Sequence, residues 1–195
     1  MAEAPPPPPP PAAPKRALAI NMRTLMAAIM ALIASIMFFT PWKAGGKEET
    51  IYGTTVKVES FINGMGSGEV KYSTPWGTST ADISYSLGWI GILSFVFTIL
   101  MFIFLLIKSL MPLIRSPAAE YYATLMDRLI LPFFFVSLII GAIYGGLLIG
   151  GVGEVEVAGT KGTLEAGYLG YGFIVFLVFD IITFLFYKRI IKIVR

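Results

Sequence analysis

The sequence predicts an α-helical membrane protein, a four-transmembrane-helix bundle with a small exoplasmic antiparallel β-sheet. Three observations lead to this fold class. Apolar residues make up 56% of the 195-residue chain and charged residues only 14%, whereas about a quarter of the residues in soluble proteins are charged. Four apolar segments have lengths close to the roughly 20 residues that cross a bilayer. The first and third connections between them alternate apolar and polar residues, as β-strands do.

Residues 1–17 form a proline-rich tail with an unbroken run from Pro5 to Pro11. Such a run cannot build a packed core and favours an extended polyproline II rod. Two interpretations stay open, a disordered cytoplasmic spacer and a docking site for a proline-recognising cytoplasmic partner. We favour the spacer, because no specificity residues flank the run.

The membrane domain, residues 18–195, is expected to begin with a span over Thr24–Thr40 that follows basic residues such as Arg23. Pro41 and Trp42 close this span at the bilayer interface, where tryptophan is favoured. A signal peptide is the competing interpretation of the same segment. It is disfavoured because no small-x-small cleavage site follows the apolar run.

The long connection 43–86 carries most of the β-strand signal. Asn63-Gly64 is a hairpin-type dipeptide, and it is flanked by alternating apolar positions, namely Tyr52, Val56, Val58, Val70, Tyr72, Ile83 and Tyr85. Together with the later hairpin, this predicts a sheet of four or five strands. We expect Trp76 to pack beneath this sheet or to lie at the headgroups, rather than to bind a ligand.

The remaining spans are predicted at residues 87–107, 129–152 and 168–187. The connection Ser116–Asp127 is short, which suits adjacent antiparallel helices. In the last connection, 153–167, Glu154–Val157 alternates strictly and turn residues follow at Gly159–Gly162. This pattern predicts a β-hairpin directly after the third span.

Small residues recur at helical spacing in two of the spans. In the third span they form two overlapping rows, which are Gly141, Gly145, Gly146 and Gly150. In the first span Ala27, Ala31 and Ser35 lie four residues apart. Because small residues let helix backbones approach closely, we expect the face of the first span to pack against the glycine rows of the third.

The distribution of Lys and Arg predicts the orientation. Three precede the first span, three lie between the second and third and four follow the fourth, whereas four lie in the long first loop and one in the last loop. The positive-inside rule, applied to the flanks near the membrane, therefore puts both termini in the cytoplasm and both β-rich loops, 43–86 and 153–167, outside. The cell membrane is the expected location.

Several classes of chemistry have no residues to support them. Cysteine and histidine are absent, which removes thiol nucleophiles, disulfides and the commonest zinc and haem ligands. No phosphate-binding loop, nucleotide fingerprint or catalytic triad is present, and no basic patch interleaved with aromatics suggests nucleic acid. We expect no enzyme activity, no cofactor and no metal site.

Asp180 is an acidic residue inside an apolar span, about two turns from its cytoplasmic end. A charge at such a depth costs on the order of 2.5–3.5 kcal/mol on the insertion scale, so a partner is expected. Arg23 and Lys108 lie near the same level, and either is predicted to form an ion pair with it. The alternative is a proton or ion relay, which usually needs several ionisable groups across the membrane.

This layout resembles the claudin and peripheral-myelin-type tetraspan architecture. The resemblance concerns topology over about residues 18–195. It implies one sheet, built by both outer loops, above a left-handed four-helix bundle. The chain has Trp42 and Trp76 but neither the Gly-Leu-Trp triplet nor the paired cysteines of claudin first loops. The resemblance implies a protein that associates laterally through its helices and its outer sheet.

We therefore expect a non-enzymatic structural or interaction protein, with the bilayer and either further copies of itself or other membrane proteins as partners. Its outer contacts are predicted at strand edges and loop tips, with Val155, Val157 and Trp76 as candidates. An accessory subunit of a respiratory or quinone-linked membrane complex is the alternative. A small transporter or channel is the third interpretation.

Overall fold

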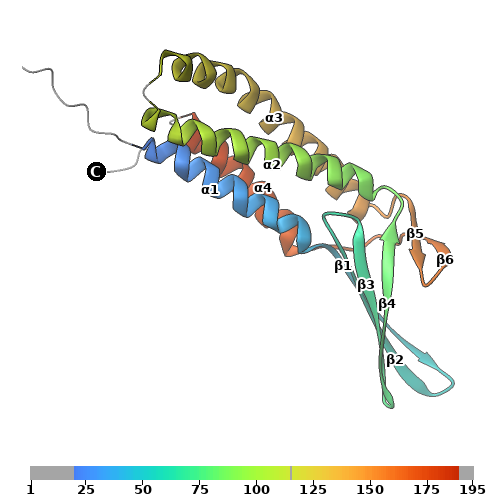
Figure 1. Cartoon of the computed structure of the whole chain (residues 1–195). Helices are drawn as coiled ribbons and strands as arrows, with labels where there is room; N and C mark the ends of the chain where they lie inside the picture. The colour runs from blue at the N-terminus through green and yellow to red at the C-terminus, as the bar shows by residue number, and fades with distance from the viewer. Residues whose placement is uncertain (1–19, 115, 189–195) are drawn as a thin grey trace, which may run out of the picture.

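The computed structural model describes residues 20–114 and 116–188, and these form a helical bundle with a β-sheet at one end (Figure 1). The sheet extends away from the ends of the helices. The predictions for the proline-rich tail, and for the basic residues that follow Lys188, lie outside the described residues.

The bundle contains four α-helices in the described part of the chain. They are α1 (Met22–Ile36), α2 (Gly88–Leu110), α3 (Pro117–Ile149) and α4 (Tyr171–Tyr187), with short 3-10 turns after the first two at Met37–Phe39 and Met111–Leu113. Three helical segments, Met22–Phe39, Gly88–Leu113 and Ala118–Ile149, are long and apolar enough to cross a membrane. They suggest a membrane location. Helix α4 has 17 residues, so a fourth span is not shown.

Helix α3 begins about three turns earlier than the sequence analysis predicted. The segment expected to connect two spans, Ser116–Asp127, is already helical from Pro117 onward. The local signals are those of a helix start: the Ser116 hydroxyl accepts a hydrogen bond from the backbone N–H of Ala118, proline occupies the first helical position, and Glu120 lies in the first turn. These signals outweigh the polarity that suggested a loop.

Helix α1 packs between α2 and α4, and α2 packs in turn against α3. Ala27, Ala31 and Ser35 are fully or almost fully buried, so the small-residue face of α1 is a packing face. Its expected partner was wrong, because α1 packs mainly against α2 and α4 rather than against the glycine rows of α3. Spacing along one helix identifies a packing face but not the helix opposite it.

Among residues 20–114 and 116–188, seven strands form a single antiparallel sheet in the order β6-β5-β4-β3-β2-β1-β7. Their bounds are β1 Pro41–Ile51, β2 Thr54–Asn63, β3 Ser67–Thr74, β4 Gly77–Tyr85, β5 Glu154–Val157, β6 Thr160–Thr163 and β7 Tyr168–Leu169. Both predicted loops contribute, but the sheet exceeds the expected four or five strands. Strand β1 was missed because Gly45-Gly46 and the charges after it hide any alternation. Tyr52, expected in a strand, occupies the β1–β2 turn with φ +49.

The bundle and the sheet join around Trp42. Its ring lies 4.7 Å from Phe38, 5.2 Å from Phe173 and 5.1 Å from Phe176, centroid to centroid, and its indole N–H donates to the Met37 carbonyl at 2.9 Å. The side chain is 1% exposed. Trp42 therefore belongs to the core, while its expected level at the bilayer interface stays a prediction. Because β1 starts directly after the first helical segment, its second residue falls between the helices and the sheet.

Candidate functional site: the groove on the sheet

The pairing register gives the sheet two chemically different faces. Lys43 pairs with Ile62, and Lys47 pairs with Val58, which in turn pairs with Tyr72. Since side chains alternate across a strand, one face collects apolar residues, and we call it the groove face: Val58, Ile62, Val70, Ile83, Val155 and Val157. The opposite face carries charged residues on the same strands, including Lys57, Glu59, Glu69, Lys71 and Asp82.

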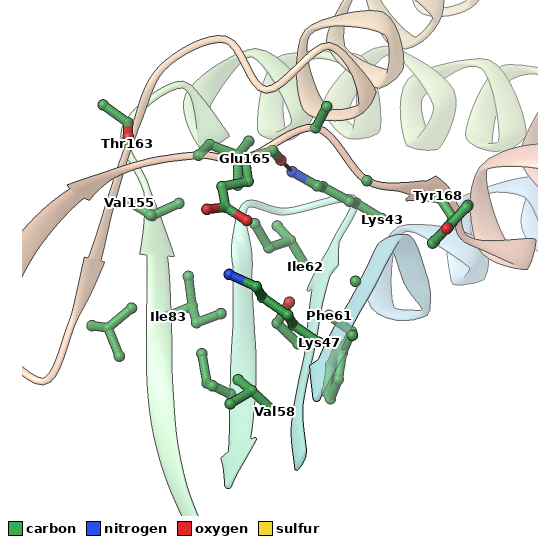
Figure 2. A pocket seen from close by; sticks show the side chains of 18 of the residues that line it. Lys43, Lys47, Val58, Phe61, Ile62, Ile83, Val155, Thr163, Glu165 and Tyr168 are labelled. Carbon is green, nitrogen blue, oxygen red and sulfur yellow. Dashed lines mark hydrogen bonds between the residues drawn. The ribbon is translucent and has the colours of Figure 1, made fainter. Parts of the chain in front are cut away.

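An open groove of about 700 Å³ lies over the groove face. Figure 2 shows its apolar side chains rising from β2, β4 and β5. The segment Leu164–Gly167, which joins β6 to β7, lines the groove at the end nearest the helices. Lys43 and Lys47 reach into the groove from β1, and Glu165 reaches in from that segment. The site is thus an apolar floor with two cations and one carboxylate.

At the end of the groove nearest the helices, Lys43 connects β1 to the segment Leu164–Gly167. Lys43 is 5% exposed, and its ammonium group donates a hydrogen bond to the backbone carbonyl of Glu165. Burial lowers the pKa of Lys43 below its usual range, and the nearby Glu165 carboxylate opposes that shift. A Cβ at Gly167 would lie 2.5 Å from Lys43 Cε and 3.0 Å from the Ala44 carbonyl oxygen. Only glycine therefore lets the segment pass this closely over Lys43.

The candidate interaction residues divide between the groove and the hairpin tips. Val155 and Val157 belong to β5 and pair with Tyr85 and Ile83 of β4. Strand β5 has a neighbouring strand on both sides, β4 and β6. Both valines line the groove and do not form a strand edge. Trp76 is 82% exposed in the β3–β4 turn. Packing beneath the sheet, one of its two expected positions, was wrong, because the turn lies at the end of the hairpin far from the bundle (Figure 1). The other expected position, at the headgroups, stays a prediction.

The two glycine rows of α3 have different surroundings. A Cβ at Gly141 would lie 2.6 Å from the Phe176 ring of α4, and one at Gly145 would meet the ring of Phe173. A Cβ at Gly146 would meet nothing within 4 Å, and Gly150 lies at the C-cap of the helix. The first row therefore receives aromatic rings of α4, whereas Gly146 has no packing partner among the described residues.

Asp180 does not form either of the predicted ion pairs. Asp180 is 0% exposed, and neither of its carboxylate oxygens has a hydrogen-bond partner in the described part of the chain. Lys108 is instead bound to Asp127 of α3, and its ammonium lies 5.0 Å from the centroid of the Tyr187 ring in α4. The Tyr187 hydroxyl also donates to the Asp127 carboxylate. The depth that the sequence predicts for each residue could not show whether Asp127 or Asp180 is the partner of Lys108.

A hydroxyl cluster between α2 and α3 was missed by the sequence analysis. Ser94 donates to the Ser137 backbone carbonyl at 2.9 Å, and the Thr98 and Ser137 hydroxyl oxygens are 2.5 Å apart. All three residues are 0% exposed. Hydroxyl side chains commonly join transmembrane helices in this way. The signal available in the sequence was hydroxyl residues at i and i+4 inside an apolar span, Ser94 and Thr98.

No group of three or more potential metal-ligating side chains occurs within residues 20–114 and 116–188. Comparison of the chain with protein-family models, with curated proteins and with solved structures finds no match. The claudin-like resemblance therefore has no support beyond the general layout of apolar helices and a sheet.

Proposed function

We propose that this chain is a non-enzymatic membrane protein that self-associates through its sheet, and that the free edge of β4 is the pairing surface. In this proposal the bundle anchors the chain, the termini are cytoplasmic and the sheet lies on the exoplasmic side, as the distribution of Lys and Arg favours. The single observation that carries it is the incomplete pairing of β4.

Strand β4 pairs with β3 from Gly77 to Ser84. On its other side it pairs with β5 only through Ile83, Ser84 and Tyr85. Residues 77–82 therefore leave one edge that no described strand covers. Such an edge presents backbone N–H and C=O groups to any strand of matching geometry, and Figure 1 shows β4 extending well beyond β5.

The composition of this edge favours strand addition. Thr78, Ser79 and Thr80 are compatible with β-structure, and Asp82 is the only charged residue in the stretch 77–82. Natural edges that avoid pairing usually carry lysine, proline or other charges. The far half of β1 has such charges, at Lys47, Glu48 and Glu49. The two long edges of the sheet thus differ, and β4 is the one without this protection.

A second copy of the same chain is the simplest partner for this edge. Two β4 strands related by a two-fold axis would pair antiparallel, and the same surface would serve both copies. Each pair would extend the sheet across the dimer and leave the groove faces available.

Disulfide scanning tests the proposal directly, because the chain has no cysteine. A single cysteine is introduced at each of residues 78–82 in turn, and each variant is oxidised in its native membrane. Cross-linked dimers are then detected on a non-reducing gel. Cross-linking should peak at the residue on the two-fold axis, because opposite Cα atoms in antiparallel pairs lie about 4.5–5.5 Å apart, within disulfide range. The matched control is Ser73→Cys on β3, whose neighbours are Lys57 and Thr78.

Equal cross-linking at Ser73→Cys and along β4 would contradict pairing at this edge. The mass of the particle extracted in mild detergent provides a second test. A multiple of 21.3 kDa with no other protein supports self-association. A particle shared with cofactor-bearing proteins would replace the proposal with the accessory-subunit interpretation.

A further inference from the structure

We propose that the tips of the two long hairpins, β1–β2 and β3–β4, dock through Tyr52 and Trp76 on the surface of a second lipid bilayer, opposite the one that holds the bundle. The inference uses side chains at the tips and not the backbone edge of β4, so it is independent of self-association. Three properties of the tips support it: the exposure of their rings, their reach and their composition.

Both long hairpins end in two-residue turns that carry an aromatic ring. The β1–β2 turn consists of Tyr52 and Gly53, and the β3–β4 turn consists of Pro75 and Trp76. Tyr52 is fully exposed and Trp76 is 82% exposed. A Cβ at Gly53 would meet nothing within 4 Å, so the surroundings of this tip are open. The two rings are therefore available to a partner outside the chain.

The turn at Tyr52 does not itself favour a tyrosine. Tyr52 and Gly53 have φ angles of +49 and +81, the pattern of a type I′ turn, for which asparagine followed by glycine is a preferred pair. This left-handed conformation is sterically unfavourable for a bulky residue. Local folding would thus favour asparagine at position 52, and the turn gives no reason for an aromatic ring there.

The short β5–β6 hairpin provides a comparison within the same sheet. Its turn, Ala158 and Gly159, has φ angles of +48 and +81 and carries no aromatic ring. Val157, just before this turn, pairs with Ile83, which lies six residues from Gly77 at the β3–β4 turn. The short hairpin therefore ends about 20 Å nearer the bundle, at 3.4 Å per residue, as Figure 1 shows. The aromatic rings accompany reach and not turn type.

The two long tips can meet one surface together. Lys57 pairs with Ser73, and β2 continues three residues past Lys57 toward its turn, whereas β3 continues one residue past Ser73. The tips thus differ by about 7 Å along the strands and lie about 10 Å apart across them. Strand β1 has 11 residues, a reach of about 35 Å. If the helices cross a bilayer, the sheet carries both rings well away from it (Figure 1).

A lipid surface suits these tips better than a protein surface. Tryptophan and tyrosine favour the membrane–water interface, because their apolar rings are buried there while their polar atoms stay hydrated. The stretches 50–56 and 72–81 contain several threonines and no charged residue, so no charge loses its hydration on contact. A stable protein interface buries about 800 Å² on each partner, far more than two separate two-residue turns present. Each ring can enter a lipid interface on its own.

Tryptophan quenching between two populations of vesicles tests the inference. Donor vesicles of plain phosphatidylcholine carry the full chain, and acceptor vesicles contain dibrominated phosphatidylcholine and no protein. Bromine quenches tryptophan only at short range, so brominated acceptors should lower the fluorescence and plain acceptors should not. Trp76→Phe should abolish this loss, because Trp42 is buried in the core and Trp89 belongs to α2.

Two variants separate docking from folding. Tyr52→Asn supplies the preferred turn residue and should raise the acceptor concentration for half-maximal quenching about tenfold or more, the effect of withdrawing one large apolar side chain from an interface. The matched control is Ala158→Trp in the Trp76→Phe chain, which carries a tryptophan on the short hairpin. It should show no quenching, because that tip ends about 20 Å short of the long ones.

Four results would overturn the inference. They are equal fluorescence with brominated and plain acceptors, quenching that survives Trp76→Phe, an unchanged half-maximal concentration for Tyr52→Asn, and full quenching of the Ala158→Trp control. Quenching of Trp76 by brominated lipid present only in the donor vesicles would also overturn it, because the tips would then lie on the membrane of their own bundle. Since the acceptors carry no protein, none of these results depends on pairing at the β4 edge.

Discussion

The two glycine rows of α3 should respond oppositely to the same substitution. Gly141→Ala adds a methyl group that would lie 2.6 Å from Phe176 Cε1, 2.8 Å from its Cζ and 3.0 Å from Ser94 Oγ. The Phe176 ring has no room to withdraw, because it is fully buried and lies 5.0 Å from Phe38 and 5.1 Å from Trp42, centroid to centroid. Gly146→Ala adds the same methyl group where nothing lies within 4 Å.

The difference between these variants isolates packing from helix propensity. Replacing glycine by alanine inside a helix stabilises it by about 1 kcal/mol, and this gain applies equally at both positions. Overpacking a tight core costs about 1–3 kcal/mol, and this cost applies only at Gly141. We therefore expect Gly141→Ala to unfold about 1–3 kcal/mol more easily than Gly146→Ala, and Gly146→Ala to be no less stable than the unaltered chain.

Thermal unfolding in one mild detergent, followed by far-ultraviolet circular dichroism, measures both variants side by side. The ranking of the two variants is the decisive observation. If Gly146→Ala destabilises the bundle as much as Gly141→Ala, then Gly146 has a packing partner and the division of the glycines into two rows is incorrect.

Substitutions at two buried residues, Trp42 and Asp180, are measured in the same assay. Trp42→Ala should cost about 3–5 kcal/mol, because a fully buried ring among Phe38, Phe173 and Phe176 leaves a cavity, whereas Trp76→Ala at an exposed tip should stay within about 0.5 kcal/mol; similar losses from both would contradict the central role of Trp42. Asp180→Leu should stabilise the bundle by about 1–3 kcal/mol, because it removes a buried carboxylate that lacks a described partner. Asp180→Asn, which keeps the polar group, should gain less, and destabilisation by Asp180→Leu would reveal a partner that the carboxylate requires.

The kinds of element and their approximate positions could be predicted from the chain alone. Apolar runs long enough for a bilayer predicted the helices, and alternation around Asn63-Gly64 and at Glu154–Val157 predicted hairpins. Strand β2 ends at Asn63, whose side chain accepts hydrogen bonds from the N–H groups of Met65 and Ser67 at 2.9 and 3.1 Å. These features depend on neighbours within a few residues, so short-range periodicity and turn chemistry are enough to predict them.

Other features depend on pairing between distant segments, and only the tertiary structure decided them. Periodicity showed that Ala27 and Gly141 belong to packing faces, but it did not show that α1 packs between α2 and α4 or that Gly141 receives Phe176. The groove likewise requires Lys43 and Glu165 to meet across more than a hundred residues. One-dimensional spacing tells which side of an element is buried. The partner of that side depends on how all the elements fill space together, because every buried face needs a complementary surface.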